Sequence, residues 1–332
     1  MKEKIALIAS YGLGDALLFL IIADNLYRNG YDATFYSNML AQMQDWIPHV
    51  KCLPFPDALP EGFDLVMADT HSVLTKNANN IGELAKKVVF FSMANQGRTK
   101  SLCADHASKF SDKPRLAKLA KGAGVAIKYA KDGDIFKREN RMVQNVETFC
   151  REILKLDHVT SDNGITPPAH LIHRQYKKRI ILHPLSSTPE RNWSADQYIE
   201  LAKQLKKRGF NPVFITSPQE RDEWIARVKD DFELPLFPSI ADLAAYVYES
   251  DYMIGNESGI GHLASNLGLP TLSIYRKRHH YQWQPNWTPG IAVKPSVLWR
   301  LFPKHAWRRF ISVRRVLKAF LAHYRLLSRR TV

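Results

Sequence analysis

The sequence predicts an α/β protein of two domains, and three observations lead to this expectation. The chain has 332 residues, enough for two domains of ordinary size. Short apolar runs alternate with helical segments over residues 5–91 and again over 179–275, as parallel strands with crossover helices require. An irregular stretch rich in Asp, Asn and Pro lies between the two patterns. The expected domains are therefore 1–165 and 179–300, with a linker at 166–178 and a tail at 301–332.

The first pattern begins with a strand, a turn and a helix. Residues 5–9 are apolar, and residues 10–15 include two glycines typical of a turn. Residues 16–28 have helical spacing and are followed by Asn29-Gly30, a common helix end. Further strands are predicted at 33–36, 64–68 and 87–91.

The second pattern repeats this alternation. Ser194 is the expected N-cap of its first helix, which Arg208-Gly209 ends. Strands are predicted at 179–183, 212–216, 251–255 and 270–275. Helices are predicted at 195–207, 219–229, 240–249 and 260–267.

Composition narrows the class of protein. A hydrophobic content of 45% is typical of a globular chain, and no stretch holds the roughly 18 apolar residues of a membrane span. The first residues lack the features of a signal peptide. Cys52, Cys103 and Cys150 are far apart and odd in number, which disfavours a disulfide framework or a zinc cluster. These features favour a cytoplasmic protein.

Charge is distributed unevenly along the chain. Of the 47 Lys and Arg residues, 14 follow Glu257, whereas none of the 32 acidic residues does. Such segregation indicates a polyanionic partner: nucleic acid, an anionic membrane or a phosphorylated substrate. A helix predicted at 307–327 carries an apolar stripe, and such a stripe commonly packs on the protein's own body. The basic residues expected to meet a membrane or an acidic acceptor are Arg308, Arg309, Arg314, Arg315 and Lys318.

The turn after the first predicted strand is the first candidate site. Gly12, Gly14 and Asp15 lie where a strand ends and a helix begins. Ligands of open parallel sheets bind at this edge, near the free N–H groups of helix N-termini. The glycine pattern lacks the third glycine of the dinucleotide fingerprint. Asp15 can alternatively be a favourable charge at the start of a helix.

Two turns of the second pattern predict a phosphate site. Residues 183–193 contain three hydroxyl side chains and Arg191, which can bind phosphate oxygens in pairs. Residues 256–262 include the small residues Ser258, Gly259 and Gly261 and open a helix, whose N-terminus attracts phosphate. Each turn can alternatively be an ordinary capped connection. The cluster of basic residues and histidines at 276–280 can contact a donor or an acidic acceptor, or can simply be solvated.

These motifs together resemble glycosyltransferase family 9, the ADP-heptose:lipopolysaccharide heptosyltransferases. The resemblance covers nearly the whole chain. It is carried by Gly14-Asp15-Ala16-Leu17, by the His-Pro-x(6)-basic-x-Trp pattern of 183–193, by 258–264, and by Gly268-x-Pro270-Thr271. It implies a GT-B fold, in which two Rossmann-like doubly wound domains with parallel sheets face a central cleft. The first domain would bind the acceptor and the second the nucleotide sugar.

The resemblance also implies roles for individual residues. Asp15 would be the general base that deprotonates the acceptor hydroxyl. Glu220 would bond the donor ribose, residues 237–240 would lie against the base, and His262 would brace the diphosphate loop. The implied donor-binding residues are Ser187, Thr188, Arg191, Glu220, Glu257, Ser258, Gly259 and His262.

Two positions depart from the family pattern. Arg191 stands where the family usually has lysine, so the charge is kept but its geometry changes. Glu257 stands where the family usually has aspartate, so the carboxylate lies one methylene farther from the backbone. An altered donor, or a member that binds sugar nucleotide without transferring it, is consistent with both departures.

The expected function is inverting transfer of heptose from ADP-heptose to a glycolipid acceptor of the inner-core lipopolysaccharide type. No metal or cofactor is expected, because the nucleotide sugar is a substrate. The expected place of action is the cytoplasmic face of the inner membrane, on its anionic surface. Alternatives are a different donor sugar, a hydrolysing 2-epimerase of the same fold, or a nucleic-acid-binding protein that uses the basic tail. No recognised nucleic-acid-binding motif supports the last alternative.

Overall fold

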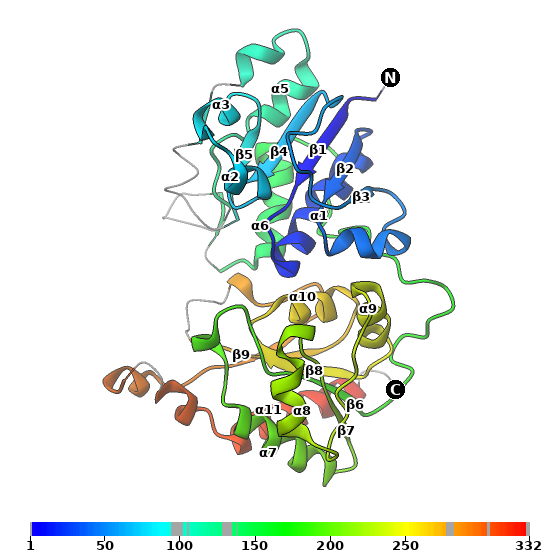
Figure 1. Ribbon diagram of the computed structural model, residues 1–332, viewed down its shortest axis with the longest axis vertical. Helices are drawn as coiled ribbons and strands as arrows, with labels where there is room; N and C mark the ends of the chain where they lie inside the picture. The colour runs from blue at the N-terminus through cyan, green and yellow to red at the C-terminus, as the bar shows by residue number, and fades with distance from the viewer. Residues whose placement is uncertain are drawn as a thin grey trace. The chain divides into compact units, whose positions relative to one another are not determined.

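The chain folds into two compact units, residues 1–168 and 169–332. The computed structural model describes residues 2–93, 102–104, 106–127, 135–137, 139–276, 282–303 and 306–329. Each unit is built around a parallel sheet that is flanked by helices, as Figure 1 shows. The boundary between the units lies within the segment predicted as a linker.

The sheet of the first unit has the strand order β3-β2-β1-β4-β5 in its described residues. All its pairings are parallel. The central strands are almost wholly apolar because helices cover both faces of such a sheet. The strands are β1 Lys4–Ile8, β2 Asp32–Tyr36, β3 Lys51–Leu53, β4 Leu65–Asp69 and β5 Val89–Phe91. The helical segments are α1 Leu13–Arg28, η1 Leu40–Trp46, α2 Val73–Asn77, α3 Ile81–Ala85, η2 Ala107–Phe110, α5 Pro114–Ala120, α6 Met142–Thr148 and η3 Phe149–Ile153.

Two features of this unit differ from the sequence-based expectation. Helix α1 begins at Leu13 rather than at residue 16, so Gly14 and Asp15 lie in its first turn. Gly12 takes an extended conformation and forms the N-cap. The short strand β3 was not predicted, because three residues are too few to show a strand period.

The second unit repeats the architecture with the strand order β10-β9-β8-β6-β7 in the part of the chain that is described. Its pairings are again parallel. The strands are β6 Arg179–His183, β7 Asn211–Phe214, β8 Tyr252–Asn256, β9 Thr271–Ile274 and β10 Ile291–Val293. The helical segments are η4 Pro189–Arg191, α7 Ala195–Lys206, η5 Pro218–Glu220, α8 Arg221–Val228, α9 Ile240–Tyr248, α10 Gly259–Asn266, η7 Val297–Leu301, η8 Ala306–Phe310 and α11 Val313–Ser328. Ser194 occupies the N-cap position of α7, but its side chain makes no capping bond.

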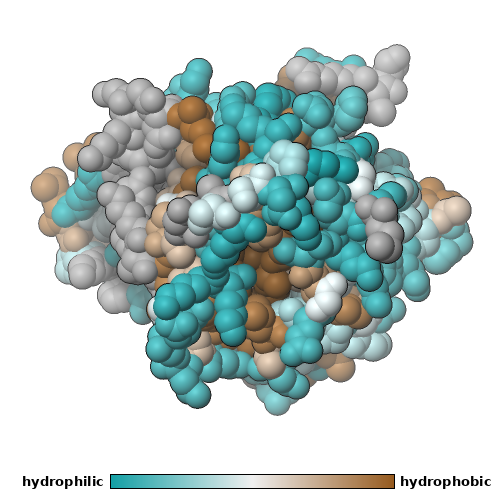
Figure 2. Space-filling model, turned by 90° about the horizontal axis from the view of Figure 1, so that it is seen from above, coloured by the Kyte–Doolittle hydropathy of each residue, from teal (hydrophilic) through white to brown (hydrophobic). Residues whose placement is uncertain are grey.

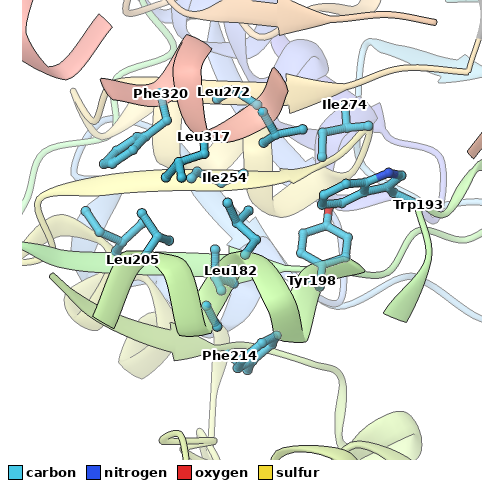
Figure 3. Packing of buried hydrophobic residues seen from close by; sticks show 14 of the residues in the cluster. Leu182, Trp193, Tyr198, Leu205, Phe214, Ile254, Leu272, Ile274, Leu317 and Phe320 are labelled. Carbon is cyan, nitrogen blue, oxygen red and sulfur yellow. The ribbon is translucent and has the colours of Figure 1, made fainter. Parts of the chain in front are cut away.

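The C-terminal segment is part of the core of the second unit. The helix predicted at 307–327 consists of two elements. The helical conformation is interrupted after η8, and Ser312 caps α11 by accepting the Arg315 N–H. Figure 3 shows Leu317 and Phe320 of α11 against the sheet residues Ile254 and Leu272. The apolar stripe therefore covers the protein's own sheet.

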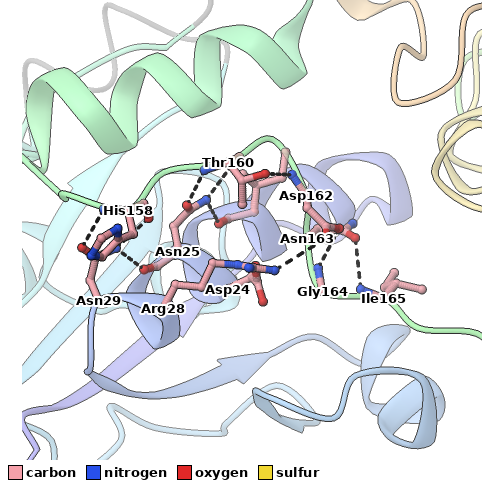
Figure 4. A network of polar contacts seen from close by, with 11 residues as sticks. Asp24, Asn25, Arg28, Asn29, His158, Thr160, Asp162, Asn163, Gly164 and Ile165 are labelled. Atoms are coloured by element: carbon pink, nitrogen blue, oxygen red, sulfur yellow. Dashed lines mark hydrogen bonds and ion pairs between the residues drawn. The ribbon is translucent and has the colours of Figure 1, made fainter.

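Hydrogen bonds hold residues 157–165 against α1 of the first unit (Figure 4). The Asn25 side chain donates to Thr160 O and accepts from Thr160 N, both at 2.8 Å. Asn29 Oδ1 accepts the backbone N–H groups of Asp157 and His158. The Asn163 side chain donates to Leu17 O. These bonds give partners to backbone groups of a segment that forms neither helix nor strand.

No helix in the described parts of the chain combines the length and the apolar character that a bilayer span requires.

Candidate active site

The carboxyl end of β1 places Asp15 at an open edge of the first sheet. Asp15 lies in the first turn of α1, and Ser10 Oγ donates a hydrogen bond to its Oδ2 at 3.1 Å. A Cβ atom on Gly12 would lie 3.4 Å from the same oxygen, in ordinary van der Waals contact, so Gly12 and the carboxylate are close neighbours. The sequence-predicted trio Gly12, Gly14 and Asp15 is thus brought together by one turn.

Asp69 lies at the end of β4, the strand next to β1, and sequence reasoning missed it. Its buried carboxylate accepts the N–H groups of His71 at 2.6 Å and of Met93 at 3.3 Å. His71 Nδ1 is 3.3 Å from Asp69 Oδ1, and the imidazole is partly exposed. An acidic residue directly after a buried strand was the signal that could have identified Asp69.

The electrostatic environment of Asp15 suits a base that works near neutral pH. Burial, and after it the negative charge of Asp69, raise the pKa of Asp15 from 3.8 to about 6. The hydrogen bond from Ser10 and the nearby His71 act in the opposite direction. A carboxylate with a pKa close to the working pH is both available and basic enough to remove a proton. The surroundings of Asp15 therefore favour proton transfer over a purely structural role.

In the second unit, the two predicted phosphate loops meet. They follow the neighbouring strands β6 and β8. Arg191 Nη1 of the first loop lies 3.6 Å from Glu257 Oε1 of the second. The Arg191 side chain is 42% exposed, so its remaining N–H groups can reach a bound anion.

Asn256 holds these two loops together and was not singled out from the sequence. Its buried side chain accepts from the Trp193 N–H at 3.1 Å and from the Tyr198 hydroxyl at 3.2 Å. Its Nδ2 donates to Pro184 O. One side chain thereby links the ends of both strands to α7.

The second loop leads into α10, whose first turn presents backbone N–H groups. Ser258 is the N-cap, and its Oγ accepts the Gly261 N–H at 3.4 Å. The N–H groups of Gly259 and its neighbours belong to the first turn, where helices have no internal partner for them. His262 is buried, and burial lowers its pKa to about 4, so the ring is neutral at pH 7. The His262 ring lies 6.1 Å from the Trp287 ring, edge to face, and this contact ties the helix to the following loop.

Of the remaining predicted donor residues, Ser187 is exposed, whereas Thr188 and Glu220 form hydrogen bonds within the second unit. Ser186 Oγ, beside Ser187, bonds Thr188 O at 3.0 Å and Asn192 Oδ1 at 2.7 Å, which shapes the loop. Glu220 Oε2 accepts from Ser217 N and Oγ in a capping box. At residues 237–240, the Phe237 ring packs on Tyr246.

The C-terminal segment braces the loop that carries Arg191. Trp307 Nε1 donates to Glu190 O at 3.2 Å. Arg308 donates from Nε to Asn192 O at 2.7 Å and from Nη2 to Pro189 O at 3.0 Å. Arg308, which was predicted to meet a membrane or acceptor, thus binds carbonyl groups of its own unit through its guanidinium. Arg309, Arg314, Arg315 and Lys318 are exposed. Residues 277–280, also singled out for their charge, lie outside the described residues.

Comparison with known families identifies this arrangement. Residues 120–297, more than half of the chain, match the family described as glycosyltransferase family 9 (heptosyltransferase). The chain belongs to glycosyltransferase family 9. The resemblance noted from the sequence motifs is confirmed.

Two relatives align over shorter segments of this family 9 chain. Lipopolysaccharide core heptosyltransferase OpsX of Haemophilus influenzae is 24% identical over 105 residues, 30% of each chain. Lipopolysaccharide heptosyltransferase 3 of Escherichia coli is 25% identical over 119 residues, 34% of each chain. The aligned segments span about a third of the length of these relatives.

A solved structure resembles the chain over nearly its full length. Escherichia coli heptosyltransferase WaaC with ADP superimposes on 97% of this chain and 99% of its own, with a TM-score of 0.64 and 13% identity. At this identity the likeness concerns the fold. The predicted α/β class, a GT-B fold of two Rossmann-like units with parallel sheets, is confirmed.

The two departures from the family 9 pattern are direct neighbours. Arg191 and Glu257, the two positions noted as departures in the sequence, face each other across 3.6 Å. The pair therefore links two positions that looked independent in the sequence.

Proposed function

We propose that this family 9 protein transfers heptose from ADP-heptose to an inner-core lipopolysaccharide acceptor, with inversion at the anomeric carbon. The observation that carries the proposal is the meeting of the two strand-end loops in the second unit. They bring the Arg191 guanidinium close to the N-terminus of α10. A guanidinium and a helix N-terminus both attract phosphate oxygens. ADP in the similar WaaC structure supports an adenine nucleotide.

The mechanism assigns one chemical role to each unit. Asp15 removes the proton of the acceptor hydroxyl, whose oxygen then attacks the anomeric carbon as the bond to the diphosphate breaks. Negative charge grows on the departing diphosphate. Arg191 and the N–H groups around Ser258 and Gly259 stabilise that charge through preorganised electrostatics. Because these groups supply the stabilising charge, we expect the rate to be unaffected by a metal chelator.

The charge of the C-terminal segment supports the proposed acceptor and place of action. A phosphorylated glycolipid lies in an anionic membrane leaflet, and the exposed cations of the C-terminal segment are attracted to such a surface. The proposed location of the protein is the cytoplasm, peripheral to the inner membrane. The relatives OpsX and heptosyltransferase 3, named for lipopolysaccharide, support this class of acceptor.

A thermal-shift comparison of ADP, UDP, GDP and CMP, each with its sugars, tests the donor. ADP compounds are expected to stabilise the protein most, and preference for UDP compounds would contradict ADP-heptose as the donor. Product analysis then tests the reaction. Transfer requires acceptor and yields a glycosylated product, whereas a hydrolysing 2-epimerase releases free sugar without acceptor.

Replacing Asp69 with asparagine should shift the pH dependence of transfer. The base must be ionised, so activity falls as pH drops through the Asp15 pKa of about 6. Removing the neighbouring charge lowers that pKa, and the acidic limb of the kcat profile should move to lower pH. Asp32→Asn is the control, because Asp32 is exposed at the amino end of β2. An unchanged limb in the Asp69 variant would contradict the proposed coupling.

Replacing Arg191 with alanine should reduce kcat on the order of a hundredfold, because a donor to the departing charge is lost. Steady-state kinetics with ADP-heptose and a deacylated inner-core acceptor measure the effect. Arg227→Ala is the matched control, since this partly exposed arginine of α8 pairs with Glu223 and not with the loops. An equal loss of kcat in both variants would show that the overall positive charge, and not the position of Arg191, determines the rate.

The Arg191–Glu257 contact predicts that the two family departures are coupled. Arg191→Lys and Glu257→Asp should each lower kcat/KM, because each shortens one side of the pair. The double variant, which has the usual family residues, should lose less than the two single losses combined. Strictly additive losses in this double-mutant cycle would show that the two positions act independently.

A further inference from the structure

The turn η7 exposes a cluster of large apolar side chains. Val297, Leu298, Leu301 and Phe302 have exposed fractions of 48%, 58%, 81% and 52%. In the described parts of the chain, the other large exposed apolar side chains are scattered along the sequence. On the face drawn in Figure 2, hydrophilic residues surround a hydrophobic area near the centre. A concentrated apolar patch on a hydrophilic surface commonly marks an interaction site. Figure 1 shows this segment, in orange-brown, projecting from the side of the second unit.

The turn is anchored, so its apolar side chains are presented on a defined support. Trp299 points the other way and packs against the core of the second unit. The Arg276 guanidinium lies 5.9 Å from the centre of the Trp299 ring. The Phe302 ring lies 5.3 Å from that of Phe310, which precedes α11. One inward aromatic residue thus supports four outward apolar ones.

Cations surround this apolar cluster. Arg300 lies within the turn, and Arg309 is adjacent to Phe310; both are exposed. Arg315 Nη1 donates to Phe310 O at 3.5 Å, so its guanidinium is near the same ring pair. None of these three arginines forms an ion pair within the described residues. No Asp or Glu occurs after Glu257.

We propose that Val297, Leu298, Leu301 and Phe302 insert into the interfacial layer of an anionic phospholipid bilayer, with Arg300, Arg309 and Arg315 at the headgroups. Amphipathic surface elements bind membranes in this way, through buried apolar area together with attraction to anionic lipid. The proposal adds an insertion site to electrostatic attraction. It rests on the proposed function only for the presence of a membrane-bound acceptor.

Charge and hydrophobicity together favour a bilayer over other partners. A nucleic acid would neutralise the arginines but would leave Leu301 and Phe302 without an apolar partner. A second copy of the chain would bring an identical set of positive charges against the first. An anionic bilayer offers negative headgroups above an apolar layer, and so satisfies both parts of the surface.

Vesicle binding by the full-length protein tests the proposal. Phosphatidylcholine vesicles with and without phosphatidylglycerol are compared by co-flotation at several salt concentrations. The variant Leu301→Ser/Phe302→Ser should bind the anionic vesicles on the order of tenfold more weakly or worse, with the salt dependence retained. The variant Arg300→Gln/Arg309→Gln should lose about fivefold per charge and show a weaker salt dependence. Ile225→Ser, an exposed apolar residue on α8, should bind like the unchanged protein.

Several outcomes would overturn the insertion site. If the Leu301/Phe302 variant binds vesicles as well as the unchanged protein, electrostatic attraction accounts for the binding without insertion. A change in solution mass with no change in vesicle binding would identify an interface between copies. Tighter binding of duplex DNA than of vesicles, abolished by the arginine variant, would identify a nucleic-acid surface.

The same samples separate this proposal from the proposed function. The Leu301/Phe302 variant should keep the thermal shift with ADP and the transfer rate to a deacylated, soluble acceptor. If the unchanged protein shows no shift with ADP but the vesicle results hold, the proposed donor is wrong and the membrane site stands. If transfer to the soluble acceptor proceeds but the variant binds vesicles normally, the membrane site is wrong and the transferase stands.

Discussion

Asp15→Asn is expected to reduce the kcat of sugar transfer by about 10²–10⁴-fold, the usual contribution of a general base. Asparagine keeps the size of the side chain and its acceptor for the Ser10 hydroxyl, but it cannot take a proton. Nucleotide binding should be unchanged, because the donor loops belong to the other unit. Kinetics with the deacylated acceptor and titration with ADP measure the two properties. Asp32→Asn is expected to retain full activity.

The stability of the Asp15→Asn variant distinguishes lost chemistry from lost structure. The folded protein raises the pKa of Asp15 from 3.8 to about 6, so it favours the protonated carboxyl. The stabilisation from this group is complete below pH about 4 and is lost as the pH rises through 6. Asparagine resembles the protonated form, so the variant should have a higher Tm than the unchanged protein at pH 7.5 and an equal Tm near pH 4. Retained kcat, or a lower Tm at pH 7.5, would contradict the assignment.

Phe320→Ala is expected to lower the free energy of unfolding of the second unit by about 3–5 kcal/mol, as for other buried phenylalanines. The Phe320 ring is fully buried and lies 5.0 Å from Tyr252 and 5.1 Å from Phe210, measured between ring centres. Its removal leaves a cavity between α11 and the sheet. Urea unfolding monitored by tryptophan fluorescence measures the change, since Trp193, Trp224 and Trp307 are buried in this core.

Leu326→Ala in the same helix is the control. Leu326 is 51% exposed, and its replacement should change stability by no more than about 0.5 kcal/mol. Equal effects of the two substitutions would show that α11 is not part of the cooperative core. Because α11 is expected to contribute to the core, a truncation that removes η8 and α11 would destabilise the second unit. Substitutions at exposed positions are therefore the appropriate test of membrane binding.

Strand positions were predictable where the chain is buried on both faces. The predicted strand at 179–183 coincides with β6, because a parallel sheet covered by helices requires an unbroken apolar run. The three-residue strands β3 and β10 show no such run, and both were missed. The early start of α1 was missed because Gly14 suggested a turn, whereas only Gly12 lies outside the helix.

The position of the candidate site along the chain was also visible in the sequence, but its internal geometry was not. Asp15, Arg191 and Ser258 each follow a predicted strand, where ligands of parallel sheets bind. That Arg191 meets Glu257 depends on β6 lying beside β8, and that Asp69 acts on Asp15 depends on β1 lying beside β4. Strand order is set by packing between distant segments, which local patterns do not encode.

The C-terminal segment shows the same division. Its charge and its apolar stripe are properties of the sequence, and they correctly indicated a basic amphipathic helix. Only the folded chain shows that this stripe covers the second sheet, that Arg308 holds the donor loop, and that the exposed apolar side chains belong instead to η7. An amphipathic pattern establishes that a face must be buried. Which surface buries it is decided by the shapes and contacts of residues far away in the chain.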